Sequence, residues 1–155
     1  MNLYHLAQIN VARGHAPLDD PRMTGFVAGL EPINSLADVS PGFVWRFQEA
    51  HDAASHVQLD EDPLVVVNLS VWEDFASLHR FVYHSEHHHF LKERRAWFER
   101  WVDNFWVALW WVPAKHRPTL AEAQERLAHL KTHGPSATAF NFRQPFPPPA
   151  SREDQ

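Results

Sequence analysis

The sequence predicts an α+β protein with the ferredoxin-like split βαβ plan, in which a four-stranded antiparallel sheet carries its helices on one face. Three observations support this fold class. The predicted elements follow the order strand–helix–strand–strand–helix–strand, which is the order of a split βαβ unit. The 155 residues suit a single domain with a sizeable core. A further helix and an arm rich in Pro and Phe follow the last predicted strand.

The first half of the chain supplies the first strand–helix–strand segment and the third strand. Residues 4–10 form the first predicted strand. Asp20 followed by Pro21 is a typical helix start, and apolar residues at helical spacing extend this helix to about residue 36, with a kink expected near Pro32. Strands are then predicted at residues 43–48 and 64–72, and the second of these is the richest in β-branched residues.

The second half supplies the remaining elements. A helix is predicted over residues 73–83, and the histidine-rich segment that follows either continues it or begins a second helix that ends near residue 101. Residues 105–112 form the fourth predicted strand. Thr119 is a typical N-cap for the last helix, and Gly134 is a typical end. The chain is thus divided into a domain at residues 1–134 and an extended arm at residues 135–155.

The predicted sheet has one face without helices. Because a face rich in Val, Trp and Phe is unfavourable in water, we expect two copies to pack face to face as a homodimer. The aromatic residues Phe140, Phe142 and Phe146 are too apolar for a free tail, so we expect the arm to wrap around the partner subunit. On this interpretation, deleting everything after Gly134 weakens the dimer.

Composition excludes several classes of function. The net charge is −5 and no long basic run occurs, which argues against a nucleic-acid partner. The absence of cysteine excludes disulfides and thiolate chemistry. No run of about 18 apolar residues is present to span a membrane, and the first residues lack the pattern of a signal peptide. We therefore expect a cytoplasmic protein with a small-molecule substrate and no membrane partner.

Four histidines occur within six residues, at positions 84, 87, 88 and 89. On a continuous helix, His84 and His88 share a face and are candidate ligands for a divalent metal. His87 is a candidate axial ligand for haem, with Arg94 placed to bind the propionates and Trp110 to line the cofactor site. The alternatives are a solvated histidine-rich face, an Arg94 paired with nearby carboxylates, and a Trp110 that packs in the core.

An acid–base site is a third interpretation of the same segment. Tyr83 and His87 stand one helical turn apart, and histidine needs little tuning to exchange protons near neutral pH. Arg46 lies between two aromatic residues on a predicted strand. It either faces the interior, where it needs a carboxylate from the substrate or the protein, or it lies in solvent.

Polar residues also interrupt the most apolar strand. Asn68 and Ser70 alternate with apolar neighbours, and they need hydrogen-bond partners if they are buried. With Arg46, Asn10 and Gln8, they form either the polar side of a pocket or pairs across a dimer interface.

Several segments, among them HLAQIN, NLSVWEDFASLHRFVYHSEH and LWWVPAKHRPT, resemble the bacterial domain-of-unknown-function family 3291 from residue 5 to about residue 146. The resemblance implies a dimeric α/β barrel of the antibiotic-biosynthesis-monooxygenase-like superfamily, which includes haem-degrading enzymes. It implies no particular reaction, because a fold does not determine a function. Similarity to the haem-degrading members aligns Asn10 with their strand Asn, but places Phe81 where they carry a Trp.

These observations lead to one functional hypothesis with two alternatives. The first is a small homodimeric monooxygenase-like enzyme that acts on an aromatic or polyketide-like substrate without a cofactor. Its catalytic residues are Tyr83, His87 as acid or base, Arg46 as stabiliser of an anion or enolate, and Asn68 as a positioning group. The alternatives are a haem- or metal-binding protein that uses residues 84–89, and a non-catalytic ligand-binding or stress-related dimer.

Overall fold

The computed structural model describes residues 3–13, 20–25, 28, 35–47, 65–84 and 107–149. The elements in these ranges are the strands β1 (Tyr4–Arg13), β2 (Phe43–Arg46), β3 (Val65–Trp72) and β4 (Val107–Pro113), the 3₁₀ helix η1 (Pro21–Met23), and the helices α2 (Phe75–His84) and α5 (Leu120–His133). None of the helices in these ranges is long and apolar enough to cross a membrane.

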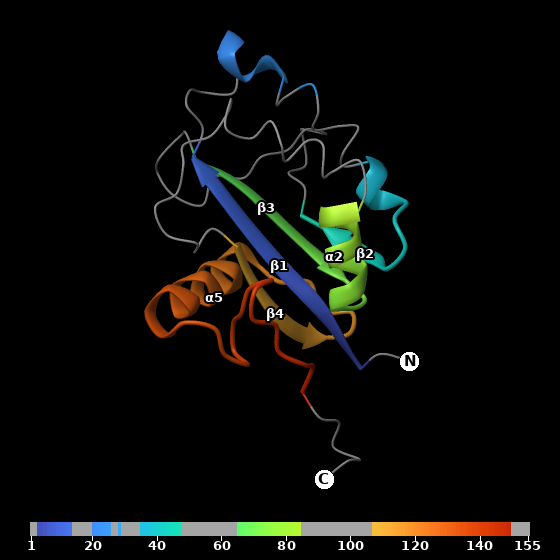
Figure 1. Ribbon diagram of the computed structural model, residues 1–155, viewed down its shortest axis with the longest axis vertical. Helices are drawn as coiled ribbons and strands as arrows, with labels where there is room; N and C mark the ends of the chain where they lie inside the picture. The colour runs from blue at the N-terminus through green and yellow to red at the C-terminus, as the bar shows by residue number, and fades with distance from the viewer. Residues whose placement is uncertain are drawn as a thin grey trace.

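The four strands form one antiparallel sheet in the order β2-β3-β1-β4 (Figure 1). The central strand β1 pairs with β3 on one side and with β4 on the other, so that Gln8 lies between Ser70 and Leu109. This strand order, together with the order of elements along the chain, is the ferredoxin-like arrangement. The predicted fold class is therefore confirmed.

One face of the sheet packs against α5. Side chains alternate between the two faces of a strand, so every second residue of β1 points to the same side. Ile9 on β1 and Trp110 on β4 are fully buried here, and α5 contributes Ala123, Leu127 and Leu130 to the same cluster. The expectation of helices on one face only is wrong, because the C-terminal helix folds back over the other face (Figure 1).

The opposite face packs against α2. Leu78 and Phe81 from α2 meet Trp72 at the end of β3, and all three are buried. The Trp72 ring lies 5.1 Å from the Phe81 ring and 5.4 Å from the Phe43 ring, measured between centroids. Trp72 therefore joins the sheet, its edge strand β2 and the helix in one aromatic contact.

The helix ends follow the capping rules. The side chain of Asp74 accepts a hydrogen bond from the backbone N–H of Ser77 at 2.8 Å at the start of α2. Thr119 caps α5 through the N–H of Glu122, and Gly134 ends α5 with φ of 74°, as expected from the sequence.

The predicted cap at Asp20 is also present. Asp20 accepts from the backbone N–H of Arg22 at 2.8 Å and begins η1. The side-chain hydrogen bond from Arg22 holds the pKa of the Asp20 carboxyl below its usual value. The kink expected at Pro32 and the helix expected up to residue 101 lie outside the described residues.

The C-terminal arm lies on the sheet of its own chain. Phe140 exchanges two backbone hydrogen bonds of 2.8 Å with Leu109 of β4 and is fully buried. The indole N–H of Trp111 donates to the carbonyl of Phe146 at 2.9 Å, and the ring of Phe142 packs against α2. The expected contact with a partner subunit stays a prediction, while these aromatic residues cover β4 and α2 of the same subunit. The reason is that β4 is an edge strand whose polar backbone groups need partners.

Gly42 makes a contact that no other residue type can make. Its φ is 85°, in the left-handed region, and a Cβ at this position would collide with the Cβ and Oγ of Ser77 on α2. Its carbonyl also accepts from the N–H of Glu73 at 2.7 Å. This glycine lets the turn before β2 approach the first turn of α2.

We predict that Gly42→Ala lowers the free energy of unfolding by at least about 3 kcal/mol, through left-handed strain and the collision with Ser77. Gly134→Ala is the matched control, since Gly134 has a similar φ but no neighbouring atom within 4 Å of the place that an alanine Cβ would occupy. Its ψ of −179° lies in a region that is essentially restricted to glycine, so this variant should cost about 1–3 kcal/mol through backbone strain alone. Urea unfolding followed by tryptophan fluorescence measures both, and equal losses would show that the contact with Ser77 is unimportant.

We further predict that Phe140→Ala lowers the free energy of unfolding by about 3–5 kcal/mol, because a fully buried aromatic side chain is removed. Phe142→Ala, which truncates a half-buried ring on the same arm, should cost about 1–2 kcal/mol. The same unfolding assay compares them. A negligible effect of Phe140→Ala would mean that the arm is not part of the folded core.

Candidate functional site

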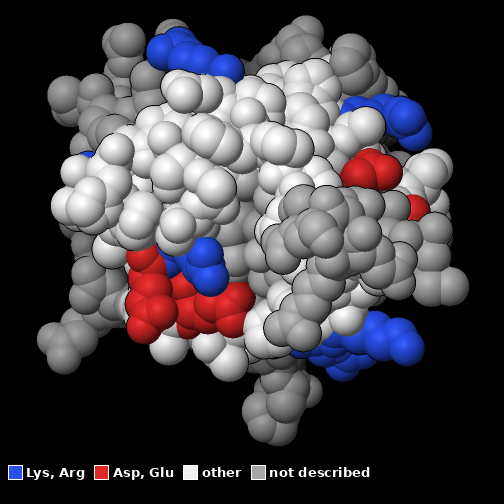
Figure 2. Space-filling view, turned by 90° about the horizontal axis from the view of Figure 1, so that it is seen from below, with Lys and Arg blue, Asp and Glu red and all other residues white. Residues whose placement is uncertain are grey.

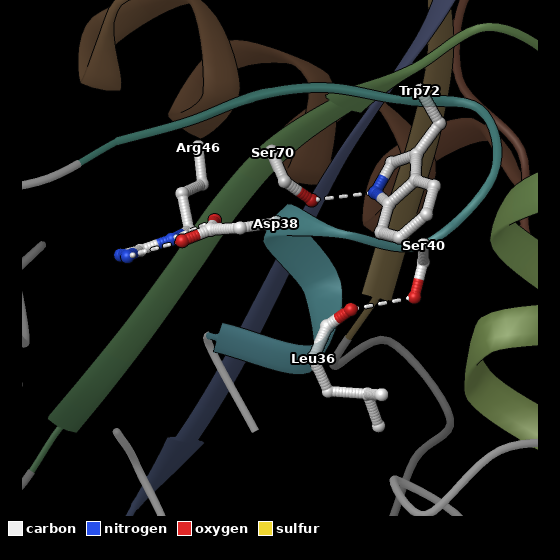
Figure 3. A network of polar contacts seen from close by, with 6 residues as sticks. All are labelled: Leu36, Asp38, Ser40, Arg46, Ser70 and Trp72. Carbon is white, nitrogen blue, oxygen red and sulfur yellow. Dashed lines mark hydrogen bonds and ion pairs between the residues drawn. The ribbon is translucent and has the colours of Figure 1, made fainter. Parts of the chain in front are cut away.

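A hydrogen-bonded group of polar side chains lies on the face of the sheet that packs against α2. The amide nitrogen of Gln8 donates to Asn68 Oδ1 at 2.6 Å and to Ser70 Oγ at 2.8 Å. The indole nitrogen of Trp72 donates to the same Ser70 Oγ at 3.0 Å (Figure 3). We call Gln8, Asn68, Ser70 and Trp72 the Ser70 network.

The strand register brings these residues together. Gln8 is the direct partner of Ser70, and Asn10 is the direct partner of Asn68, on the antiparallel pair β1–β3. Asn68, Ser70 and Trp72 are two residues apart along β3, so they share a face. The sequence pattern identified the polar residues, but the inclusion of Trp72 depends on its indole turning back toward Ser70.

The network lies between solvent and the core. Gln8 and Ser70 are 6% and 5% exposed, and they are the only buried polar residues in the described part of the chain. Trp72 beside them is also buried, whereas Asn68 is exposed and Asn10 is half-buried. A polar path therefore leads from the surface at Asn68 to Ser70 in the interior, and no member of the network carries a charge.

Arg46 has a carboxylate partner within the protein. It faces Ser70 in the pairing of β2 with β3, and its side chain is 13% exposed. Its guanidinium binds Asp38 through Nε to Oδ1 at 2.9 Å and Nη2 to Oδ2 at 3.4 Å (Figure 3). Arg46 is thus half-buried, between the two predicted environments, and the chain itself supplies its carboxylate. Nothing in the sequence pattern marked Asp38 as this partner.

Tyr83 does not join the Ser70 network. It is 42% exposed, and its ring stacks on His79 at 4.6 Å and meets Phe142 at 5.7 Å. Phe75, one turn before His79, also contacts Phe142. Tyr83 thus belongs to an aromatic stripe of α2 that holds the C-terminal arm.

Trp110 lies on the other side of the sheet. It is fully buried in the cluster with α5, and its indole donates to Glu122 Oε2 at 2.8 Å. The other oxygen of Glu122 binds His116 Nε2 at 2.7 Å. These are the contacts of a core residue with a charged partner, and the sheet separates them from the Ser70 network.

Most of the predicted metal and haem ligands lie beyond the described ranges. His84 is the last residue of α2, while His87, His88 and Arg94 fall outside the residues that the structure describes. No group of three or more metal-binding side chains occurs among the described residues. Metal binding by His84 and His88, and haem binding by His87 and Arg94, therefore stay predictions.

Charged side chains are scattered on the face seen in Figure 2. The Lys and Arg side chains drawn there lie apart from one another, and the largest group of acidic side chains has a basic side chain beside it (Figure 2). This view shows no continuous basic surface.

We predict that Ser70→Ala lowers the free energy of unfolding by about 1–3 kcal/mol, because the N–H groups of Gln8 and Trp72 lose a buried acceptor. Ser136→Ala is the matched control, since Ser136 Oγ also accepts a hydrogen bond, from Thr138 N–H, but in an exposed turn. It should change the value by less than about 0.5 kcal/mol. Urea unfolding measures both variants, and equal effects would mean that the buried network does not stabilise the fold.

Three solved structures are similar to this chain. PA3566 from Pseudomonas aeruginosa is 14% identical with a TM-score of 0.48, and the match covers 75% of this chain and 99% of that chain. SnoaB, a cofactor-independent oxygenase from Streptomyces nogalater, is 15% identical with a TM-score of 0.46, covering 73% and 95%. The NE2512 protein of unknown function from Nitrosomonas europaea is 12% identical with a TM-score of 0.47, covering 77% and 97%.

No curated protein matches the sequence. Residues 5–155 match the family described as a domain of unknown function, DUF3291. This match includes the sheet from the second residue of β1 onward, the Ser70 network and the C-terminal arm. The protein therefore belongs to the DUF3291 family.

Proposed function

We propose that the protein is a small oxygenase-like enzyme that binds an aromatic or polyketide-like substrate next to the Ser70 network. The observation that carries this proposal is the network itself. Two buried polar side chains, Gln8 and Ser70, lie on a face otherwise lined by Trp72, Phe81 and Leu109. Sites for small molecules typically combine such an apolar lining with a few fixed polar groups.

The chemistry of the network suits orientation more than proton transfer. Its four members are neutral amide, hydroxyl and indole groups, which donate and accept hydrogen bonds without changing charge. Arg46, which lies opposite Ser70 in the pairing of β2 with β3, already forms a two-bond ion pair with Asp38. A substrate that supplies its own electrons to oxygen needs binding, orientation and stabilisation of a developing charge, and fixed dipoles provide these. His87 stays the sequence-based candidate for acid–base catalysis.

Within this proposal, Asn68 has the positioning role. It is exposed, so an incoming molecule meets it first, and Gln8 holds its carboxamide oxygen at 2.6 Å. Its amide nitrogen is the donor that a carbonyl on the substrate would meet.

We also propose that the enzyme works as a cytoplasmic homodimer. Trp45 and Phe47 are only partly buried at the β2 end of the face that packs against α5, and they offer apolar surface for a second copy. Analytical ultracentrifugation of the full chain tests this state. We expect a single species of twice the chain mass, and a monomer at micromolar concentration would contradict the proposal.

The activity is tested by oxygen uptake with a panel of polycyclic phenols and aromatic ketones. We expect at least one compound to consume oxygen faster with the protein than without it, and Asn68→Ala to reduce this rate at least about tenfold. Thr132→Ala, which truncates an exposed polar residue of α5, should leave the rate unchanged. If no compound in the panel reacts or binds, the proposed function is wrong.

A further inference from the structure

The hydrogen bonds to Ser70 come from groups that can only donate. An indole N–H is a donor and never an acceptor, so Trp72 requires Ser70 Oγ to accept at 3.0 Å. The side-chain nitrogen of Gln8 is also a donor, and it reaches the same oxygen at 2.8 Å. Within the described part of the chain, these are the two hydrogen-bond partners of Ser70.

The two donors determine where the Ser70 proton points. A serine hydroxyl has one proton and two lone pairs arranged tetrahedrally around the oxygen. With both lone pairs occupied and one direction taken by Cβ, the O–H bond occupies the remaining direction. The hydroxyl therefore acts toward any further group as a donor in one fixed direction, and it cannot turn to accept.

The same two contacts strengthen this donor. Hydrogen bonds polarise one another along a chain, so N–H groups that donate to Oγ draw electron density from the hydroxyl and make its proton more positive. Ser70 is only 5% exposed, and a buried hydrogen-bond donor without an acceptor costs free energy. An acceptor that meets this proton is thus favoured, and more so when it carries negative charge.

We infer that the Ser70 hydroxyl donates a hydrogen bond to the bound molecule, so that the site selects aromatic ligands with an acceptor oxygen, such as a ketone, enolate or phenolate, over their hydrocarbon counterparts. This inference rests on the proposed function, because it assumes that a small molecule binds beside the Ser70 network. It adds the chemical class that the site distinguishes and the atom that makes the distinction.

The test compares 1-indanone with indane, which share a ring system and differ by the carbonyl oxygen. Dissociation constants are measured by ¹H–¹⁵N NMR titration of the full chain, with the Trp72 indole and Gln8 amide signals assigned. The quantity compared is the ratio of the two dissociation constants, since it cancels general changes in the site. We expect Ser70→Ala to weaken the binding of 1-indanone about tenfold relative to the binding of indane. Ser70→Thr, which keeps the hydroxyl, should leave the ratio unchanged.

Each outcome has a defined meaning. In Ser70→Ala, the N–H of Trp72 or Gln8 has lost its acceptor and can donate to the ketone oxygen in place of Ser70. A change in the chemical shift of that N–H on adding the ketone, seen only in the variant, would show that the ketone oxygen binds at the same position and would support the inference. An unchanged ratio without such a shift overturns the inference while leaving ligand binding intact. If neither probe binds the unchanged protein, the proposed function fails and the inference fails with it.

Discussion

The pairing register between β1 and β3 is the constraint on which the rest of the structure depends. It places Gln8 opposite Ser70 and Ile9 opposite Leu69, so the polar pair faces α2 and the apolar pair faces α5. A slip of one residue would exchange the two faces of a strand. Both helices would then meet the wrong side chains, since α5 packs its apolar residues Ala123, Leu127 and Leu130 against the sheet and the Ser70 network needs both strands. The core and the candidate site are therefore specified together.

The surroundings of the network explain how its geometry is maintained. Trp72 donates to Ser70 only while its ring stays between Phe43 and Phe81, which come from β2 and α2. The close approach of Gly42 to Ser77 holds those two elements against each other. Three separate parts of the chain thus position one indole N–H. A site supported by packed aromatic rings on regular elements holds its polar groups more accurately than one carried on loops.

Local patterns predicted the elements, and long-range packing accounts for most differences. The alternation in the strands, the caps at Asp20 and Thr119, and Gly134 all depend on neighbouring residues, so the sequence contains them. The return of α5 over the second face of the sheet, the pairing of Arg46 with Asp38, and the contact of Tyr83 with the arm depend on three-dimensional approach. No periodicity encodes such contacts. The polar residues of β3 were recognisable because they interrupt an apolar strand, whereas Trp72 looks like any core residue in the sequence.

The bridge between Leu109 and Phe140 has a consequence for biosynthesis. The central strand β1 is made before its second neighbour β4, which begins only at residue 107, and the bridge that covers the edge of β4 needs residue 140. A nascent chain emerging from the ribosome therefore holds an incomplete sheet with an exposed β4 edge until residue 140 has been translated. Such edges pair readily with other chains, and pairings between distant segments form slowly. Chains of this protein that stop between residues 113 and 140 thus carry an unpaired β4 edge.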